Sequence, residues 1–164
     1  MFNVRNSGGP KLKSLYNAEY RDELAARVQR VRPDSPRLWG RMTAPQMICH
    51  LDDSFLGVMG EKAMEIPRGF TLWPLVKYIA LYAPMEWPKG VPTRPEFDQQ
   101  AGAGTPPSHF ESDVRRLLGT MDRFARRPRD FQFRPHPMFK VMSEAQWMRW
   151  GYLHVDHHLR QFGQ

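Results

Sequence analysis

The stretch SEAQWMRWGYLHVDHHLRQFGQ, residues 143–164, has the pattern of one long amphipathic helix. Ser143, followed three residues later by a glutamine, forms a capping box, which satisfies the free N–H groups of a first helical turn. At about 100° per residue, Trp147 and Trp150 fall on the same side of this helix as His154. A side that carries two indole rings favours the protein interior. The stretch therefore predicts a helix that faces a hydrophobic core and brings histidine with it.

Outward from this stretch, three more segments repeat apolar residues every three to four positions, which is the period of a helix. Thr43 and Gln46 form a second capping box, and Pro45 between them is compatible with a first helical turn. The prolines of PDSP, residues 33–36, prevent an earlier helix from continuing. The helices expected from these patterns span about 17–32, 43–58, 107–127 and 143–162.

A long irregular region, about 61–105, separates the second and third of these segments. It contains many of the 15 prolines and has room for a short helix near 75–82. Connections of this length usually cross the surface or carry a function, and crossing connections are familiar in four-helix bundles. We therefore predict an all-α four-helix bundle with a long Pro-rich connection between its second and third helices. Residues 1–13 are expected to form a flexible arm, and 14–164 a single domain.

The composition excludes several classes of protein. The net charge is +7, from 24 Lys+Arg against 17 Asp+Glu, but the basic residues are scattered and no nucleic-acid motif accompanies them. A basic surface explains them better than nucleic-acid binding. The single cysteine, Cys49, excludes an internal disulfide framework and favours a packed thiol in a reducing compartment. No apolar run approaches the ~20 residues of a membrane span. We expect a cytoplasmic protein without a membrane partner.

Three histidines have the spacing of a metal site. His154 and His158 lie one helical turn apart on one face, with Cβ atoms about 6 Å apart. Imidazoles placed in this way can bind one ion at ~2.0–2.1 Å each, as in the zinc-binding His-x-x-x-His helix. His50, at the edge of the apolar stripe of the second helix, is the candidate third ligand. Alone it would more often be a hydrogen-bonded core histidine, but facing helices of bundles commonly build metal sites.

At these residues the sequence resembles the DinB-like superfamily of metal-dependent four-helix-bundle proteins. The resemblance implies a divalent ion bound by His50 in QMICHLDDS and by His154 and His158 in HVDHHLRQF. Within the superfamily, LWGRMTAPQMICHLDDS, RPHPMF and HVDHHLRQFG resemble one family of unknown function with a C-terminal HxDHHLRQFG motif. The resemblance extends from Leu15 to about Gly163. One departure is Lys140, where a glycine is expected after HPMF.

Three neutral imidazoles leave coordination positions open, which is typical of catalytic rather than structural metal sites. Such an ion lowers the pKa of a bound water toward ~7, and this chemistry predicts a hydrolase. It can also bind a thiol, and the resemblance implies a thiol-dependent S-transferase with a low-molecular-weight thiol and a small-molecule substrate. A non-enzymatic bundle that binds a metal or ligand is the alternative. Zinc or nickel is the expected ion, and a homodimer is compatible with the pattern.

Two further residues are candidates for secondary catalytic roles. Asp53, close to His50 on the second helix, could orient a ligand imidazole or accept a proton. A solvated carboxylate is the alternative for Asp53. His157, on the shoulder of the histidine stripe, could shuttle protons or support a ligand, and a polar contact between helices is its alternative. The aromatic residues of 61–105 would suit a pocket wall over the metal or a cover for one side of the bundle.

Overall fold

The computed structural model describes residues 12–66 and 73–164. Within these residues the chain is helical and contains no β-strand, so the prediction of an all-α protein is confirmed. Four of the helices correspond to the predicted ones, and a short fifth lies in the connection as expected. The elements are α1 (Ala18–Arg30), α2 (Ala44–Met59), α3 (Trp73–Tyr82), the 3-10 helix η1 (Pro95–Phe97), α4 (Phe110–Ala125) and α5 (Glu144–Gln161).

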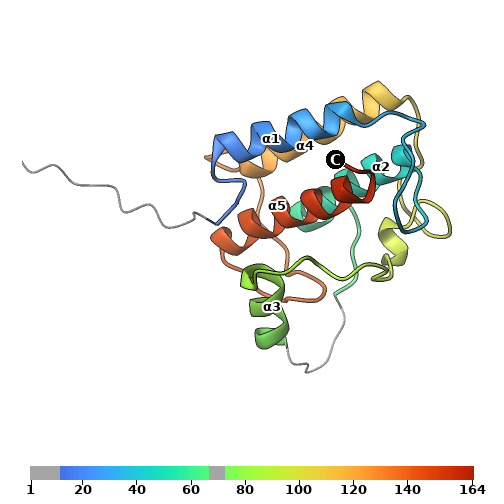
Figure 1. Cartoon of the computed structure of the whole chain (residues 1–164). Coiled ribbons are helices and arrows are strands. Elements are labelled where there is room, and N and C mark those ends of the chain that lie inside the picture. Colours follow the sequence, from blue (N-terminus) through green and yellow to red (C-terminus); the bar gives the residue numbers. More distant parts are fainter. Residues whose placement is uncertain (1–11, 67–72) are drawn as a thin grey trace, which may run out of the picture.

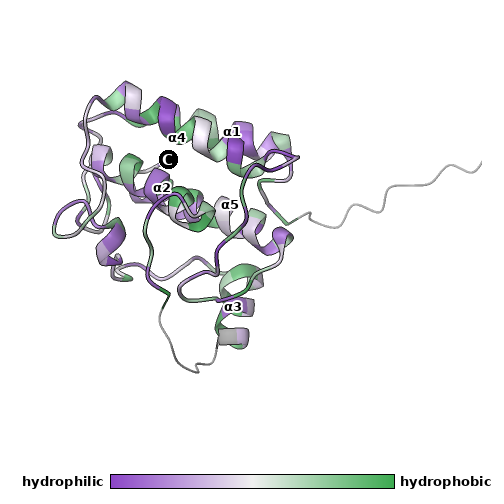
Figure 2. Cartoon of the chain, turned by 180° about the vertical axis from the view of Figure 1, so that it is seen from behind, coloured by the Kyte–Doolittle hydropathy of each residue, from purple (hydrophilic) through white to green (hydrophobic). Residues whose placement is uncertain are grey.

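Helices α1, α2, α4 and α5 pack against one another, and α3 packs against α5 on the side away from α1 (Figure 1). Figure 2 shows hydrophobic residues recurring along these helices between hydrophilic ones, as expected for helices that share a core. No helix in the described part of the chain is both long and apolar enough to span a membrane.

The predicted helix starts are confirmed by their hydrogen bonds. Thr43 Oγ1 accepts from the backbone of Gln46 at 3.4 Å, and Gln46 Oε1 accepts from the backbone of Thr43 at 2.9 Å. Ser143 and Gln146 form the same reciprocal pair. The ends were predicted less well, because the first helix stops at Arg30 and α4 covers only 110–125 of the predicted 107–127.

The core forms where α2, α4 and α5 meet. Trp147 and Trp150 are buried, as the stripe on α5 predicted. The Phe55 ring centroid lies 4.8 Å from that of Phe124 and 5.9 Å from that of Trp150. Gly151 lies beside this cluster, and a Cβ there would stand 2.6 Å from the Leu15 side chain. The packing on this face of α5 therefore leaves no space for a larger residue than glycine.

The connection between α2 and α4 is bonded to α2 by a buried carboxylate. Asp53, 1% exposed, accepts hydrogen bonds from the Thr105 backbone at 2.7 Å, the Thr105 hydroxyl at 2.6 Å and Gln99 at 3.1 Å. The ring of Phe97 packs so closely on Gly57 that a Cβ there would lie 2.6 Å from it. These contacts fix η1 against α2 and thereby position the Phe97 backbone.

Of the predicted arm, residues 1–11 lie outside the described part of the chain. Lys13 belongs to the folded body, because its Nζ lies 3.4 Å from a Glu23 carboxylate oxygen and 5.5 Å from the centre of the Tyr152 ring. The backbone of Leu15 also donates to the Met148 carbonyl at 3.1 Å.

Lys140 has a backbone φ of 56°, in the left-handed region that favours glycine. The turn around it is closed by two backbone hydrogen bonds between His136 and Lys140, each 2.8 Å long. The departure from the expected glycine therefore falls on a residue whose conformation disfavours a side chain.

Replacing Lys140 with glycine is expected to raise the free energy of unfolding by up to about 1 kcal/mol. Relief of left-handed strain, worth roughly 1–2 kcal/mol, is partly offset by the greater entropy of glycine in the unfolded chain. Chemical denaturation of the wild-type and Lys140→Gly proteins measures the difference. A Lys140→Ala variant keeps a Cβ and should show no gain, and an equal gain in both variants would contradict the strain argument.

Candidate metal centre

Three histidine side chains from two helices meet at one point. His50 comes from α2, and His154 and His158 come from successive turns of α5; one potential ligand atom from each lies within 4.8 Å of the others. The ring centroid of His50 lies 5.4 Å from that of His154 and 4.7 Å from that of His158, and the two rings on α5 are 4.9 Å apart. This separation is small enough for three nitrogen atoms to share one ion.

His50 is 6% exposed and is oriented by the connection. Its Nδ1 lies 3.0 Å from the backbone carbonyl of Phe97. Because a carbonyl can only accept, Nδ1 carries the hydrogen, and the lone pair of the neutral ring is left on Nε2. Burial lowers the pKa of His50, which favours this neutral form. The packing of η1 on α2 therefore leaves Nε2 as the atom able to bind an ion.

His158 is oriented by the last residue of α5. Gln161 Nε2 donates to the Trp39 carbonyl at 2.7 Å, so its Oε1 is the atom 3.1 Å from His158 Nδ1. Nδ1 of His158 must therefore donate, which again leaves the lone pair on Nε2. Gly40 has a φ of 81°, and a Cβ there would lie 2.1 Å from Gln161 Nε2. Glycine at position 40 is thus required for the Gln161 side chain to reach the Trp39 carbonyl.

His154 carries the clearest sign of a missing partner. Its Nδ1 is buried and has no hydrogen-bond partner within the described residues. Its ring stacks on Trp150, with centroids 4.9 Å apart and planes 28° apart. Burial, with smaller contributions from the neighbouring histidines, lowers the pKa of His154 well below the ordinary range. A buried nitrogen left unsatisfied costs free energy, and a group bound at the triad would account for it.

The three residues fit a divalent ion in their chemistry as well as their position. Burial is the main cause of the lowered pKa of each ring. All three are therefore neutral near pH 7, and the neutral imidazole is the form that binds metal. Two of them have an oxygen acceptor on Nδ1, which is the usual support of a metal-bound histidine.

Two indole rings lie near the histidines, Trp87 beside His154 and His157 and Trp39 beside His157. The ring of Trp87 lies 6.2 Å from that of His154 and 6.0 Å from that of His157, and its Nε1 donates to the Ala80 carbonyl at 2.7 Å. Trp39 lies 6.1 Å from His157. The connection thus places the ring of Trp87 beside the histidines, and both interpretations of its aromatic residues, a pocket wall and a cover for the bundle, stay predictions.

The structure places His157 next to the triad and Asp53 among the contacts that hold the connection on α2. The His157 ring lies 5.3 Å from that of His158, and its Nδ1 is buried without a partner in the described residues. The carboxylate of Asp53 bonds Gln99 and Thr105, and none of these contacts is with an imidazole. Its burial argues against the solvated carboxylate. Catalytic roles for His157 and Asp53 stay predictions.

Cys49 is unsuited to nucleophilic catalysis. It is fully buried on α2, and burial, followed by the nearby Asp113 carboxylate, raises the pKa of its thiol to about 12. The thiolate is the reactive form of cysteine, so this thiol is inert near neutral pH. The structure agrees with the prediction that Cys49 is a packed side chain.

His136 supports the loop before α5. The backbone N–H groups of Met138 and Phe139 donate to its Nδ1 at 3.1 and 3.0 Å, and its ring stacks on Phe139. Burial, with the charge of Arg94, lowers the pKa of His136 to about 3. Protonation at Nδ1 would also break both hydrogen bonds, so the folded protein holds this ring neutral.

Stability should therefore fall in acid partly through His136. Because its pKa is lowered by folding, the stabilisation is complete above the unfolded value of ~6.5 and is lost as the pH falls toward 3. Between pH 7.5 and 5, the metal-free wild-type protein is expected to lose about 2 kcal/mol more than His136→Asn, whose amide oxygen can replace Nδ1 as acceptor. Denaturant titrations at both pH values measure this difference, and equal losses would contradict it.

Two supporting groups were not predicted from the sequence, the Phe97 carbonyl and the Gln161 amide. Gln161 had a detectable signal, because it falls on the same side of α5 as His154 and His158. The Phe97 carbonyl had none, since any residue supplies a carbonyl and only the path of the connection selects this one.

Comparison with protein families identifies the family of this chain. The family described as "Protein of unknown function (DUF1569)" matches residues 14–164, so the chain belongs to this family. Searches of curated proteins and of solved structures gave no match. The family description names no activity.

Proposed function

We propose that this protein is a metal-dependent enzyme that hydrolyses a small molecule or transfers a thiol to it. The observation that carries the proposal is the convergence of the three neutral imidazoles of His50, His154 and His158 within 4.8 Å. A divalent ion, zinc or nickel, held by three imidazoles keeps its full charge and open positions, and it supplies Lewis acidity toward water or a small thiol.

The chain's own residues would position the substrate and restrict water. Trp87, fixed through Ala80, provides apolar surface beside His154, and Trp39 provides it beside His157, as small-molecule sites usually do. Nδ1 of His157, which has no hydrogen-bond partner among the described residues, is available to form one with a bound ligand. Phe97 and Gln161 hold two of the imidazoles in place before any ligand binds.

The DinB-like four-helix bundle is part of this proposal. It is supported by the packing of α1, α2, α4 and α5 and by the origin of the histidines, one from the second of these helices and two from the last. The long connection between α2 and α4 is the crossing segment that such a bundle needs.

The first test is the metal content of protein purified without a histidine tag. Elemental analysis is expected to find about one equivalent of a divalent ion in the wild-type chain and almost none in His154→Ala. The matched control is His109→Ala, because His109 is exposed at the start of α4. Loss of metal in both variants, or no metal in wild type after incubation with zinc or nickel, would overturn the proposed site.

Turnover is the second test. The metal-loaded protein is assayed with thiol donors and electrophilic acceptors, and separately with simple esters and amides. Activity is expected in one of these panels and should disappear in His154→Ala and on chelation. Metal binding without turnover in either panel would replace the enzyme by the non-enzymatic metal-binding bundle.

A further inference from the structure

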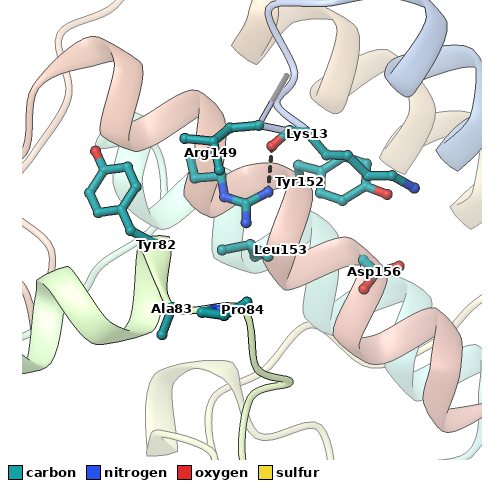
Figure 3. A pocket seen from close by; sticks show the side chains of 9 residues that line it. Lys13, Tyr82, Ala83, Pro84, Arg149, Tyr152, Leu153 and Asp156 are labelled. Carbon is teal, nitrogen blue, oxygen red and sulfur yellow. Dashed lines mark hydrogen bonds between the residues drawn. The ribbon is translucent and has the colours of Figure 1, made fainter. Parts of the chain in front are cut away.

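A second candidate site lies on another side of α5. A pocket of about 380 Å³ opens between α5, the segment that follows α3 and the start of the described chain (Figure 3). Arg149 and Tyr152 of its wall lie about 140–160° around the helix from His154, so the pocket is separate from the histidine triad. It is lined by Leu12, Lys13, Tyr82, Ala83, Pro84, Arg149, Tyr152, Leu153 and Asp156.

Arg149 contributes a cation that forms no salt bridge within the described residues, although the charge of Asp156 acts on it from a greater distance. Its Nε donates to the Leu81 carbonyl at 2.9 Å and its Nη1 to the Lys13 carbonyl at 2.7 Å. No carboxylate in the described part of the chain lies within ion-pair distance of it. Burial lowers the pKa of Arg149, whereas a paired arginine would be stabilised as a cation. The edge formed by Nη1 and Nη2 keeps free hydrogens, and this edge matches a carboxylate.

The other charges of the pocket are already matched. The carboxylate of Asp156 lies 2.7 Å from Arg27 and 3.0 Å from Arg160. Lys13 lies 3.4 Å from Glu23. The excess positive charge of the pocket therefore belongs to Arg149, whose guanidinium lies between Tyr82 and Tyr152 in Figure 3.

We propose that this pocket binds a small organic anion, a carboxylate on an aromatic or apolar body. The carboxylate would pair with the free edge of the Arg149 guanidinium, a charge-assisted contact with two parallel hydrogen bonds. The body would lie against Tyr82, Pro84 and Leu153, in a volume that suits a compact ring system. This site does not depend on the metal or on the proposed enzymatic activity.

The test uses 2-naphthoate and its neutral analogue 2-naphthamide as probes of the full-length, chelator-treated protein. Both are titrated while the backbone and arginine side-chain NMR signals are followed. Naphthoate is expected to shift the signals of Ala83, Leu153 and Arg149 Nε and to bind about tenfold or more tightly than naphthamide, because only it can pair with the guanidinium.

Three variants separate the pairing of naphthoate with Arg149 from general effects on folding. Arg149→Met should bind both probes equally weakly. Because this change also removes two hydrogen bonds to the backbone, Pro84→Glu provides a second route: it keeps Arg149 and adds a competing carboxylate to the wall, so it should lose naphthoate binding. Arg115→Met, an exposed arginine on α4, is the matched control and should bind as wild type does.

Equal binding of the two probes to wild type would overturn the proposal. So would unchanged naphthoate binding in a folded Arg149→Met protein, or signal shifts confined to the histidine face of α5. His154→Ala is expected to bind naphthoate normally even though it loses metal. Failure of the metal centre and failure of this pocket are therefore distinguishable.

Discussion

The Gln161→Leu variant is expected to bind a divalent ion roughly ten- to a hundredfold more weakly than the wild-type chain. Gln161 accepts a hydrogen bond from His158 Nδ1 and donates one to the Trp39 carbonyl. Leucine has a similar size but removes both contacts, so the imidazole loses the acceptor that fixes its orientation and the position of its proton. Competition with a chromophoric chelator gives the affinity.

A control and a second variant distinguish a changed orientation of the His158 imidazole from a loss of folding. Gln132→Leu makes the same change at an exposed position and should leave the affinity unchanged. Gln161→Glu keeps an acceptor for His158 and loses only the donor to Trp39, so it should bind the ion more tightly than Gln161→Leu. In metal-free protein, nitrogen NMR should find the His158 proton on Nδ1 in wild type and a mixture of tautomers in Gln161→Leu. Wild-type affinity in Gln161→Leu would show that this contact does not support the site.

The parts of the site that the sequence predicted depend on local periodicity. The capping box at Ser143 fixes where α5 begins, and the burial of Trp147 and Trp150 fixes its rotation. Once that rotation is set, residues one turn apart must share a face, so His154 and His158 could be placed together. The same reasoning placed His50 near the edge of the apolar stripe on α2.

The parts that were not predicted depend on where the irregular segments run. The Phe97 carbonyl reaches His50 because Asp53 holds the connection on α2 and because Gly57 leaves space for the Phe97 ring. None of these contacts follows from helical periodicity, since they join residues far apart in the sequence. The likeness to bundles that use a histidine triad added the expectation of a metal, but it gave no information about these supports.

The path of the connection also explains why Asp53 contacts no imidazole. Its position close to His50 suggested a partner for an imidazole, because neighbouring side chains on a helix commonly interact. The structure instead surrounds its two oxygens with the backbone and hydroxyl of Thr105 and the amide of Gln99, and Lys62 lies 3.4 Å away. These contacts support the path of the connection, which in turn positions the Phe97 carbonyl. Asp53 therefore contributes indirectly to the orientation of His50.

Removal of the metal is expected to lower the melting temperature by roughly 8–16 °C. An ion that binds only the folded chain stabilises it by RT ln(1 + [L]/Kd), about 4.1 kcal/mol when the free ion is at 1,000 times its Kd. For a chain of this length, each kcal/mol changes the melting temperature by about 2–4 °C. The ion is expected to bind only the folded chain, because it would join α2 to α5 and unfolding separates His50 from the other two histidines. Thermal denaturation followed by circular dichroism, with excess free zinc or with chelator, measures the shift.

His154→Ala provides the decisive control for this shift. Without its third ligand the site should hold the ion too weakly to matter, so zinc and chelator should leave the melting temperature of this variant unchanged. His109→Ala should keep the full wild-type shift, because that exposed side chain takes no part in the triad. If chelation lowers the melting temperature of wild type and His154→Ala by the same amount, the stabilising ion is bound elsewhere. If it changes neither, although elemental analysis shows metal in the wild type, binding is not coupled to folding through these three histidines.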